Sequence, residues 1–160
     1  MILYMHGLRS NATTVKASLV EDMQCYVIDY EKHDYAGTEL FYENVIKNND
    51  VEMIVGHSLG GYWALKLGNK YQIPVVLVNP SLFPRVTLGY PPCTVEDTVN
   101  KSHRFLYLEM DDEVLDSEKT YNFLYGTTSI LKVEGGHHRV EHLDKLKDYI
   151  NNCLNYTIVG

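Results

Sequence analysis

The amino-acid sequence predicts an α/β protein with about six mostly parallel strands and helices on both faces of the sheet. Three observations predict this class. Short apolar segments alternate with segments of helical periodicity from the first residues onward. Residues 74–78 read PVVLV and are almost entirely branched and apolar, as is typical of a strand buried on both faces. Residues 51–71 pass directly from an apolar run into a helical pattern through the sequence GHSLGG.

The first fifty residues predict two strands and two helices. The short apolar segment 2–5 ends just before Gly7 and predicts a strand. Apolar residues at helical spacing predict helices over 14–23 and 39–47, with a strand at 25–28 between them. The apolar positions are Val15, Leu19 and Met23 in the first helix and Leu40, Phe41, Val45 and Ile46 in the second.

The next segments complete the centre of the predicted sheet. The apolar run 51–55 predicts a strand, residues 59–71 a helix, and residues 74–78 the following strand. Residues 80–103 then contain prolines at 80, 84, 91 and 92 and little periodicity, apart from a short helix expected near 95–100. Loops of this length in a compact domain are usually lids or binding loops. We therefore expect 82–103 to form a lid-like excursion over the carboxyl edge of the sheet.

The last third of the chain repeats the alternation. Residues 105–108 and 129–133 predict strands, and 117–124 predicts a helix with Ser117 as its N-cap. A closing helix is expected over 140–153, and the tail 155–160 is expected to fray. One face of the closing helix would carry Val140, Leu143, Leu146, Ile150 and Leu154.

Composition limits the possible functions. A chain of 160 residues predicts one domain, 1–160, with enough interior for a core. The net charge of −7 argues against nucleic acid as a partner, because phosphates would be repelled. The three cysteines form no CxxC pair, so we expect no disulfide framework or zinc site and a cytoplasmic location. No signal peptide and no membrane span are expected from the apolar runs.

The sequence GHSLGG at 56–61 predicts a nucleophile elbow. A serine hydroxyl attacks only when a base removes its proton, so it must stand clear of the sheet. A sharp strand-to-helix turn achieves this, and Gly56 and Gly60 fit the crowding that such a turn creates. Two other interpretations are a glycine-rich helix start capped by Ser58 and a phosphate-binding turn. The first gives no reason for the glycine pair, and the second lacks the lysine of GxxxxGK.

An elbow requires an acid and a histidine later in the chain, in that order. The acidic segment 109–116 follows one predicted strand, and His137 and His138 follow another. Parallel sheets build their sites at these carboxyl ends. Sequence reasoning alone does not choose among the five acidic residues of the segment or between the two histidines. His142 lies four residues after His138, but no further ligand cluster supports a metal pair.

Two backbone N–H groups are expected to form an oxyanion hole. The N–H of Leu59, at the start of the helix after Ser58, is the first expected donor. The loop after the first strand would supply the second from Leu8. We expect His6 to support this loop rather than act as a base, whereas Arg9 could face either solvent or substrate.

With these residues the chain resembles an α/β-hydrolase. More narrowly, the chain resembles the YqiA family of small bacterial esterases. The matching segments are LYMHGLRS, KASLV, IVGHSLGGYWA, PVVLVNPS, DEVLD and VEGGHH, and they occur in the expected order through nearly the whole chain. GxSxG alone marks only the superfamily, but the combination is much more selective.

The resemblance implies which acid and which histidine act. The family's acid is the first aspartate of GDEVLD, which falls on Asp112, and its histidine is the last of EGG-x-H, which falls on His138. Asp111 replaces the glycine of that motif, so a neighbouring charge could raise the pKa of the acid or offer a substitute. His137 stands in the variable position, where it could exchange roles with His138. Residues 82–103 look shorter than the family's corresponding region, which implies a reduced lid.

The resemblance therefore implies an esterase or thioesterase without cofactor or metal that acts on a small-molecule acyl ester or thioester. Ser58 would attack the carbonyl carbon, and His138 would move the proton. Asp112 would orient the imidazole of His138, and the N–H groups of Leu8 and Leu59 would stabilise the oxyanion. One alternative is a non-catalytic protein that uses the same pocket to bind a ligand or partner. Another is a peptidase or acyltransferase with the same triad. Neither the natural substrate nor the oligomeric state is readable from the sequence.

Overall fold

The computed structural model describes residues 1–11, 13–84 and 89–159. Within these residues the chain forms one six-stranded sheet of order β2-β1-β3-β4-β5-β6, in which every neighbouring pair is parallel. The strands are β1 (Ile2–Met5), β2 (Met23–Cys25), β3 (Met53–His57), β4 (Val75–Val78), β5 (Arg104–Glu109) and β6 (Ser129–Val133). The helices are α1 (Tyr35–Lys47), α2 (Leu59–Tyr71), α3 (Ser117–Leu124) and α4 (Leu143–Val159), with 3₁₀ turns η1 (Val15–Ser18), η2 (Tyr30–Lys32) and η3 (Val95–Thr98). The predicted α/β class with a parallel sheet is confirmed.

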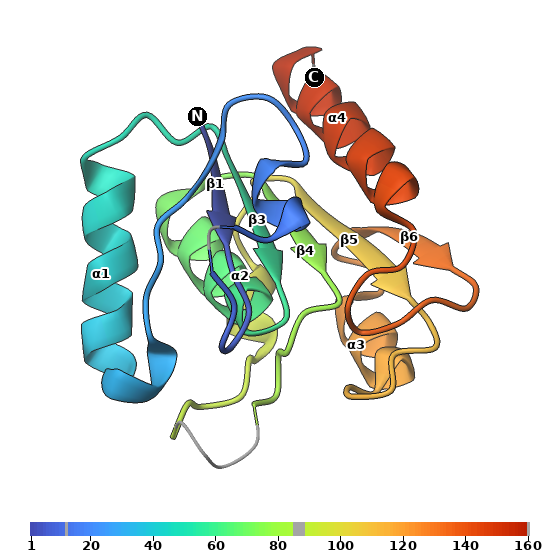
Figure 1. The fold of residues 1–160 in the computed structure, drawn as a ribbon, viewed down its shortest axis with the longest axis horizontal. Coiled ribbons are helices and arrows are strands. Elements are labelled where there is room, and N and C mark those ends of the chain that lie inside the picture. The colour runs from blue at the N-terminus through green and yellow to red at the C-terminus, as the bar shows by residue number, and fades with distance from the viewer. Residues whose placement is uncertain (12, 85–88, 160) are drawn as a thin grey trace.

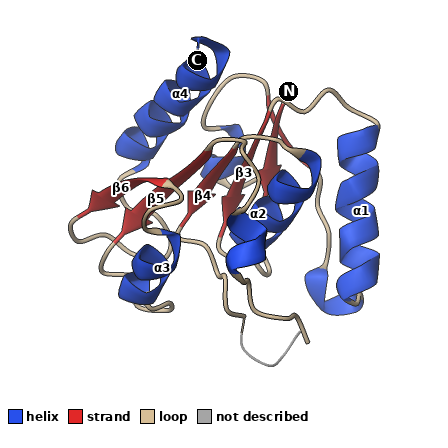
Figure 2. Cartoon of the chain, turned by 180° about the vertical axis from the view of Figure 1, so that it is seen from behind, coloured by secondary structure: helices blue, strands red, loops and turns tan. Residues whose placement is uncertain are grey.

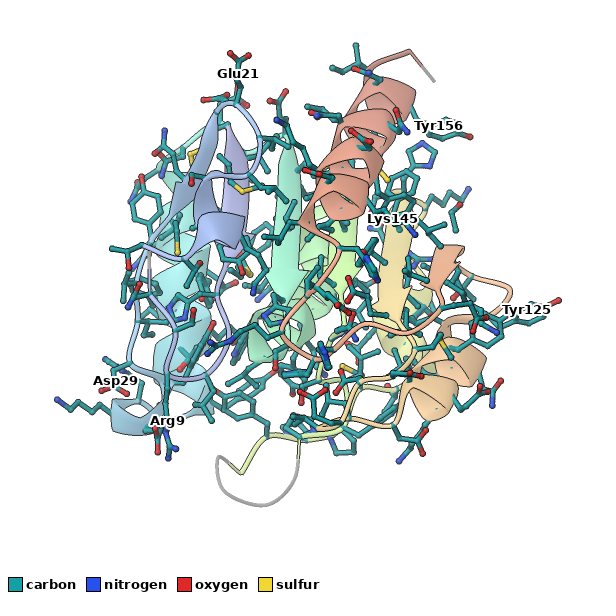
Figure 3. All side chains as sticks on the ribbon, turned by 45° about the vertical axis from the view of Figure 1, so that its right-hand side comes forward. Arg9, Glu21, Asp29, Tyr125, Lys145 and Tyr156 are labelled. Carbon is teal, nitrogen blue, oxygen red and sulfur yellow. The ribbon has the colours of Figure 1, made fainter. Side chains whose placement is uncertain are left out.

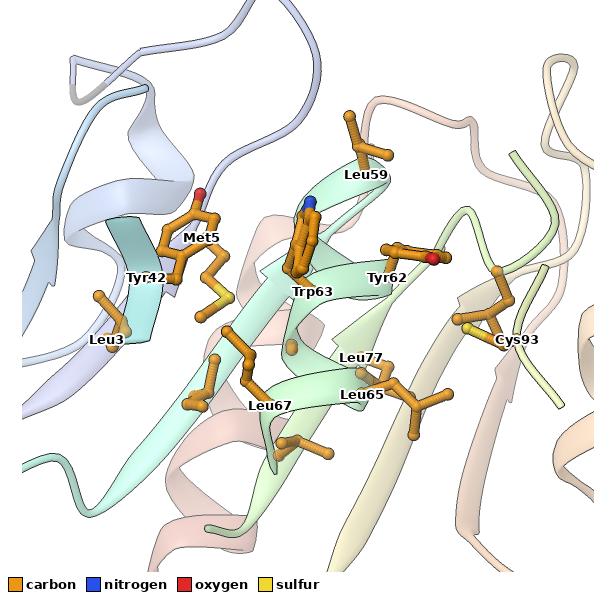
Figure 4. Packing of buried hydrophobic residues seen from close by; sticks show 14 of the residues in the cluster. Leu3, Met5, Tyr42, Leu59, Tyr62, Trp63, Leu65, Leu67, Leu77 and Cys93 are labelled. Atoms are coloured by element: carbon orange, nitrogen blue, oxygen red, sulfur yellow. The ribbon is translucent and has the colours of Figure 1, made fainter. Parts of the chain in front are cut away.

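The helices cover both faces of the sheet. Figure 1 shows α4 in front of the strands, and Figure 2, from behind, shows α1, α2 and α3 on the opposite face. Two apolar cores result because alternate residues of each strand point to opposite faces. Leu3 and Met5 of β1 join the core under α1 to α3, whereas Ile2 and Tyr4 join the core under α4. Figure 4 shows Tyr62, Trp63 and Leu65 of α2 within the first of these cores. Burial of this apolar surface supplies the main driving force for folding.

The predicted helix over 14–23 is wrong. Only η1 forms there, and Met23 already belongs to β2, where it pairs with Ile2 of β1. Asp22 has a left-handed backbone, with φ of 62°, and its carbonyl accepts a hydrogen bond from Ile2 N–H. Pairing with β1 therefore ends the helical segment early. The strand predicted at 25–28 is correspondingly shifted to 23–25.

Four helix ends also differ from prediction. Helix α1 starts at Tyr35, capped by Asp34, rather than at residue 39. Asp116, not Ser117, caps α3, because its carboxylate accepts a hydrogen bond from Lys119 N–H at 3.1 Å. Helix α4 starts at Leu143 rather than at Val140 and continues to Val159, so the tail does not fray within the described residues. The ring of Tyr156 packs edge-on against His103 at 5.0 Å, which holds the last turns of α4 against the molecule. Gly160 lies outside the described residues.

The described part of the predicted excursion packs against α2. Tyr62 O–H donates to the carbonyl of Pro91 at 2.6 Å, and the rings of Tyr62 and Tyr90 stack with centroids 5.2 Å apart. Lys66 forms an ion pair with Asp97 at 3.2 Å. The short helix expected near 95–100 is the 3₁₀ turn η3, and residues 85–88 of the excursion lie outside the described residues.

Within the described part of the chain, none of the helices combines the length and the apolar character that a membrane crossing requires.

Candidate active site

Ser58 lies on a strained turn between β3 and α2. Its backbone has φ of 57° and ψ of −119°, a conformation that costs a residue with a side chain on the order of 1–3 kcal/mol. A Cβ atom at Gly60 would overlap the carbonyl of Met5, and one at Gly56 would overlap the backbone of Gly60. The turn therefore requires glycine at both positions, and it presents the Ser58 side chain at the carboxyl edge of the sheet.

Three side chains from distant segments meet at this edge. Ser58 Oγ lies 2.9 Å from Nε2 of His138, and Nδ1 of His138 lies 2.7 Å from Oδ2 of Asp112. Asp112 follows β5 and His138 follows β6, at the carboxyl ends of their strands. An ionised Asp112 accepts a hydrogen bond from Nδ1–H, which leaves Nε2 unprotonated and able to accept the hydroxyl proton of Ser58.

The surroundings of Asp112 keep its carboxylate ionised. Its side chain is only 1% exposed, and this burial alone would raise its pKa. Hydrogen bonds from His138, from the N–H of Leu115, from Asn79 and from the N–H of Val114 outweigh burial and lower the pKa of Asp112 to about 2. The two N–H groups donate to Oδ1 at 2.8 Å each, and the Asn79 amide donates to Oδ2 at 3.0 Å.

Asp111 and His137 lie outside this arrangement in the structure. Asp111 is exposed, and its N–H donates to the carbonyl of Gly135. The side chain of His137 is 61% exposed and lies 3.5 Å from the carboxylate of Glu113. Geometry therefore favours Asp112 and His138 over their sequence neighbours.

The side chain of His57 holds the backbone of His138 in place, a role that the sequence analysis did not predict. The Nε2–H of His57 donates to the carbonyl oxygen of His138 at 2.8 Å, and the two rings lie with centroids 5.2 Å apart. Burial, then the charge of Lys16, lowers the pKa of His57 to about 3, so the ring is neutral at ordinary pH. The sequence signal for this role was the position of His57 directly before the candidate nucleophile Ser58.

Asn79 was also missed. It lies directly after β4, with φ of 39°, and its side chain is buried. The side-chain amide donates to the carbonyl of Glu109 and to Asp112, and its oxygen accepts from the N–H of Glu109, all at 3.0 Å. Asn79 therefore ties the end of β5 and the carboxylate to β4. The sequence signal was the VNP segment, whose role is set only by these contacts.

Glu109 at the end of β5 holds the segment that carries His138. Its buried carboxylate accepts hydrogen bonds from Tyr107 O–H and from backbone N–H groups after β6. Burial by itself would raise the pKa of Glu109, but these hydrogen bonds lower it. The N–H donors belong to His137, Glu141 and His142.

A metal site is poorly supported by the same contacts. Among the described residues, Glu109, Glu141 and His142 bring possible ligand atoms within 4.8 Å of one another. Both oxygens of Glu109 already accept two hydrogen bonds each, which a cation would have to displace. The two ring nitrogens of His138 contact Ser58 and Asp112, so His138 has none left for a metal shared with His142.

The loop after β1 lies beside Ser58. A Cβ atom at Gly7 would lie 3.4 Å from Cβ of Ser58. Nδ1–H of His6 donates to the carbonyl of Gly7 at 2.7 Å, and its Nε2 accepts from the N–H of Ile28 at 3.1 Å, in agreement with the supporting role expected for His6. In a trans peptide the Leu8 N–H points opposite to the Gly7 carbonyl, and therefore away from the His6 ring.

Leu59 is the other predicted oxyanion-hole residue, and Arg9 is the residue whose orientation the sequence left open. Leu59 is the first residue of α2, where helix N–H groups have no intrahelical partner. No hydrogen bond between described residues uses the N–H of Leu8 or of Leu59 as donor. Arg9 forms an exposed ion pair with Glu31 at 2.9 Å, and Figure 3 shows it projecting from the same end of the molecule as Asp29. This pairing turns Arg9 toward solvent.

The chain is similar to proteins of one bacterial family along nearly its whole length. A model of the uncharacterised protein family UPF0227 matches residues 1–90. A UPF0227 protein of Pectobacterium carotovorum is 26% identical over 93% of this chain and 98% of its own length. A UPF0227 protein of Vibrio vulnificus is 27% identical over 95% of this chain and 99% of its own length. The UPF0227 protein YcfP of Escherichia coli is 26% identical over 93% of this chain and 98% of its own length.

Solved structures show the same fold at low sequence identity. Est1E from Butyrivibrio proteoclasticus, solved with ferulic acid bound, has a TM-score of 0.78 at 13% identity, over 99% of this chain and 89% of its own. The monoacylglycerol lipase of Paleococcus ferrophilus has a TM-score of 0.70 at 14% identity, over 96% of this chain and 93% of its own. The family resemblance and the fold class expected from the sequence are both confirmed. The chain belongs to the family UPF0227 and has the α/β-hydrolase fold.

Proposed function

We propose that this protein is a serine hydrolase that cleaves carboxylic esters or acyl thioesters through an acyl-serine intermediate. The observation that carries the proposal is the continuous hydrogen-bonded chain from Ser58 Oγ through His138 to Asp112. Such a chain lets an imidazole remove the hydroxyl proton as the oxygen attacks a carbonyl carbon. The backbone strain at Ser58 supports the same proposal, because strain of this kind concentrates at functional sites.

In the first half of the proposed reaction, Ser58 Oγ bonds to the carbonyl carbon while its proton moves to Nε2 of His138. The carbonyl oxygen becomes an oxyanion, which the N–H groups of Leu59 and Leu8 would stabilise. Asp112 holds the imidazole in the required tautomer and stabilises its cationic form. His138 then gives the proton to the departing alkoxide or thiolate, and the acyl group remains on Ser58.

In the second half a water molecule attacks the acyl-serine. His138 takes a proton from this water, the oxyanion forms again at the same N–H groups, and Ser58 recovers its proton as the acid leaves. The reaction needs no cofactor and no metal. Asp112 remains ionised throughout, in keeping with its pKa of about 2.

Further features belong to the proposal. We expect the whole chain, 1–160, to be one domain in which residues 82–103 form a reduced lid, and a small-molecule substrate rather than nucleic acid. A cytoplasmic location fits the three free cysteines, Cys25, Cys93 and Cys153. The ferulic acid bound to Est1E and the monoacylglycerol lipase from Paleococcus ferrophilus make feruloyl esters and monoacylglycerols reasonable first substrates.

A fluorophosphonate probe tests the proposal. We expect covalent labelling of the wild-type protein, no labelling of Ser58→Ala, and full labelling of the control Ser18→Ala on an exposed turn. Turnover of 4-nitrophenyl acetate should fall by at least about 10⁴-fold in Ser58→Ala. Wild-type protein that is folded but neither labels nor turns over any ester would instead favour the non-catalytic binding protein.

A further inference from the structure

A cavity lies between two segments that contact the candidate site. It has a volume of about 360 Å³ and opens between the segment after β4 and the segment that leads into α3. Both walls are hydrogen-bonded to the site residues. The N–H of Ser81 donates to the carbonyl of Ser58, and the N–H of Leu115 donates to Asp112, each at 2.8 Å. The cavity is therefore lined by immediate neighbours of the site, whereas Ser58, Asp112 and His138 themselves do not line it.

Most of the cavity lining is apolar. Leu82, Phe83 and Leu115 contribute to it, and Phe83 is held edge-on by the ring of Phe123, with centroids 5.2 Å apart. If each heavy atom takes roughly the 30 Å³ of a liquid water molecule, the cavity holds on the order of ten non-hydrogen atoms. This size suits a short acyl chain or a single aryl group, but not a long fatty acid.

One cationic side chain, Lys119, is part of this mostly apolar lining. Nζ of Lys119 lies 4.3 Å from the centre of the Phe83 ring, a cation–π contact that fixes the ammonium at the cavity. Among the described residues Lys119 makes no ion pair. The other charged group of the lining, Asp116, accepts a hydrogen bond from Lys119 N–H at the first turn of α3, where the helix dipole offsets its charge.

We propose that this cavity binds an apolar group of about ten non-hydrogen atoms that ends in a carboxylate, and that Lys119 pairs with this carboxylate. The inference rests on the proposed hydrolase function and deepens it by naming the substrate class: esters in which one half carries an anionic end. The acid half or the alcohol half of the ester could supply this group. In a protein with a net charge of −7, a cation is needed here to attract such a substrate.

Matched substrate pairs test the proposal in two arms. The acid arm compares mono-4-nitrophenyl adipate with 4-nitrophenyl hexanoate, which have equal chain length but differ in the terminal carboxylate. The alcohol arm compares 4-carboxyphenyl acetate with phenyl acetate. The measured quantity is the ratio of kcat/KM for the charged ester to kcat/KM for the neutral ester. In one arm, this ratio should be higher for the wild-type protein than for Lys119→Met.

We expect Lys119→Met to lower kcat/KM for the charged ester by roughly tenfold at low ionic strength and less at high salt, with the neutral ester within twofold. Lys119→Arg should retain the preference. The control Lys145→Met removes one exposed charge on α4 and should change neither ester. A Lys119→Met variant that affects charged and neutral esters equally in both arms overturns the proposal.

A binding measurement separates this inference from the proposed reaction. Calorimetric titration of Ser58→Ala with monomethyl adipate and 4-carboxyphenyl acetate measures the cavity without turnover. Binding of either that weakens about tenfold in Ser58→Ala/Lys119→Met supports the cavity assignment even if the wild-type protein hydrolyses no ester. Hydrolysis of neutral esters without any Lys119-dependent binding or preference leaves the hydrolase function standing and rejects the assignment.

Discussion

The elbow around Ser58 and the segments that carry Asp112 and His138 are built in different ways. At the elbow, backbone packs directly on backbone, and the absence of Cβ atoms at Gly56 and Gly60 makes the turn possible. The segments of the acid and the histidine are instead held by hydrogen bonds that Asn79 and His57 donate and that the Glu109 carboxylate accepts. Steric requirements leave a short, local pattern in the sequence, whereas a polar network leaves scattered single residues.

The largest expected effect separates the two histidines. His138→Ala should lower kcat for 4-nitrophenyl acetate by about 10⁴-fold, equivalent to about 5.5 kcal/mol, because no other imidazole contacts Ser58 among the described residues. His137→Ala should stay within about threefold, since its side chain faces solvent. Steady-state kinetics on both variants measures this, and the opposite pattern would assign the base to His137.

The next largest effect concerns the stability of the elbow. Gly60→Ala places a methyl group into the Met5 carbonyl, so we expect a loss of roughly 4 kcal/mol in the free energy of unfolding, or no folded protein. Gly126→Ala offers a control at a glycine with an open environment but a φ of 88°, where only backbone strain of about 1 kcal/mol is expected. Urea unfolding followed by circular dichroism compares them. Equal stability of the two variants would contradict the steric account.

The polar network has a pH-dependent signature. The pKa of Asp112 is lowered from 3.8 to about 2, so its ionised form stabilises the folded protein above pH 4. This contribution, about 2 kcal/mol, is lost as the pH falls from 4 toward 2. Asp112→Asn should therefore lose less stability over this range than the wild type does, whereas the exposed Asp111→Asn should follow the wild type. Chemical unfolding at several pH values tests this, and parallel curves for Asp112→Asn and wild type would exclude it.

The smallest expected effect is at His57. Its neutral ring donates one hydrogen bond to the His138 carbonyl, so His57→Leu should lower kcat about tenfold with little change in KM. His57→Gln keeps a donor and should recover most of the loss. Because the pKa of His57 is about 3, neither variant should add or remove an ionisation in the pH–rate profile between pH 5 and 9. A shifted profile would mean that His57 itself exchanges protons during turnover.

Prediction from the sequence was most accurate for elements whose hydrophobic periodicity or steric requirements involve only residues close together in the chain. Helix α2 has the predicted bounds, 59–71, and β6 has the predicted bounds, 129–133. The helix predicted over 14–23 failed because pairing of Met23 with β1 overrides its helical spacing. The start of α4 was placed too early because the N–H groups of Glu141 and His142 bind Glu109 instead of continuing the helix. Both errors come from contacts between segments far apart in the chain.

The sequence by itself determined the α/β class, the family and the position of the elbow. These depend on apolar spacing, motif order and glycines that remove Cβ atoms, and all of them are local properties. The family resemblance implied Asp112 and His138, but only the tertiary structure shows their hydrogen bonds to each other and to Ser58, and the cavity with Lys119 among the neighbouring segments. These arrangements depend on hydrogen bonds and packing between segments separated by dozens of residues. Such contacts exist only once the parallel strands bring their carboxyl ends to one edge.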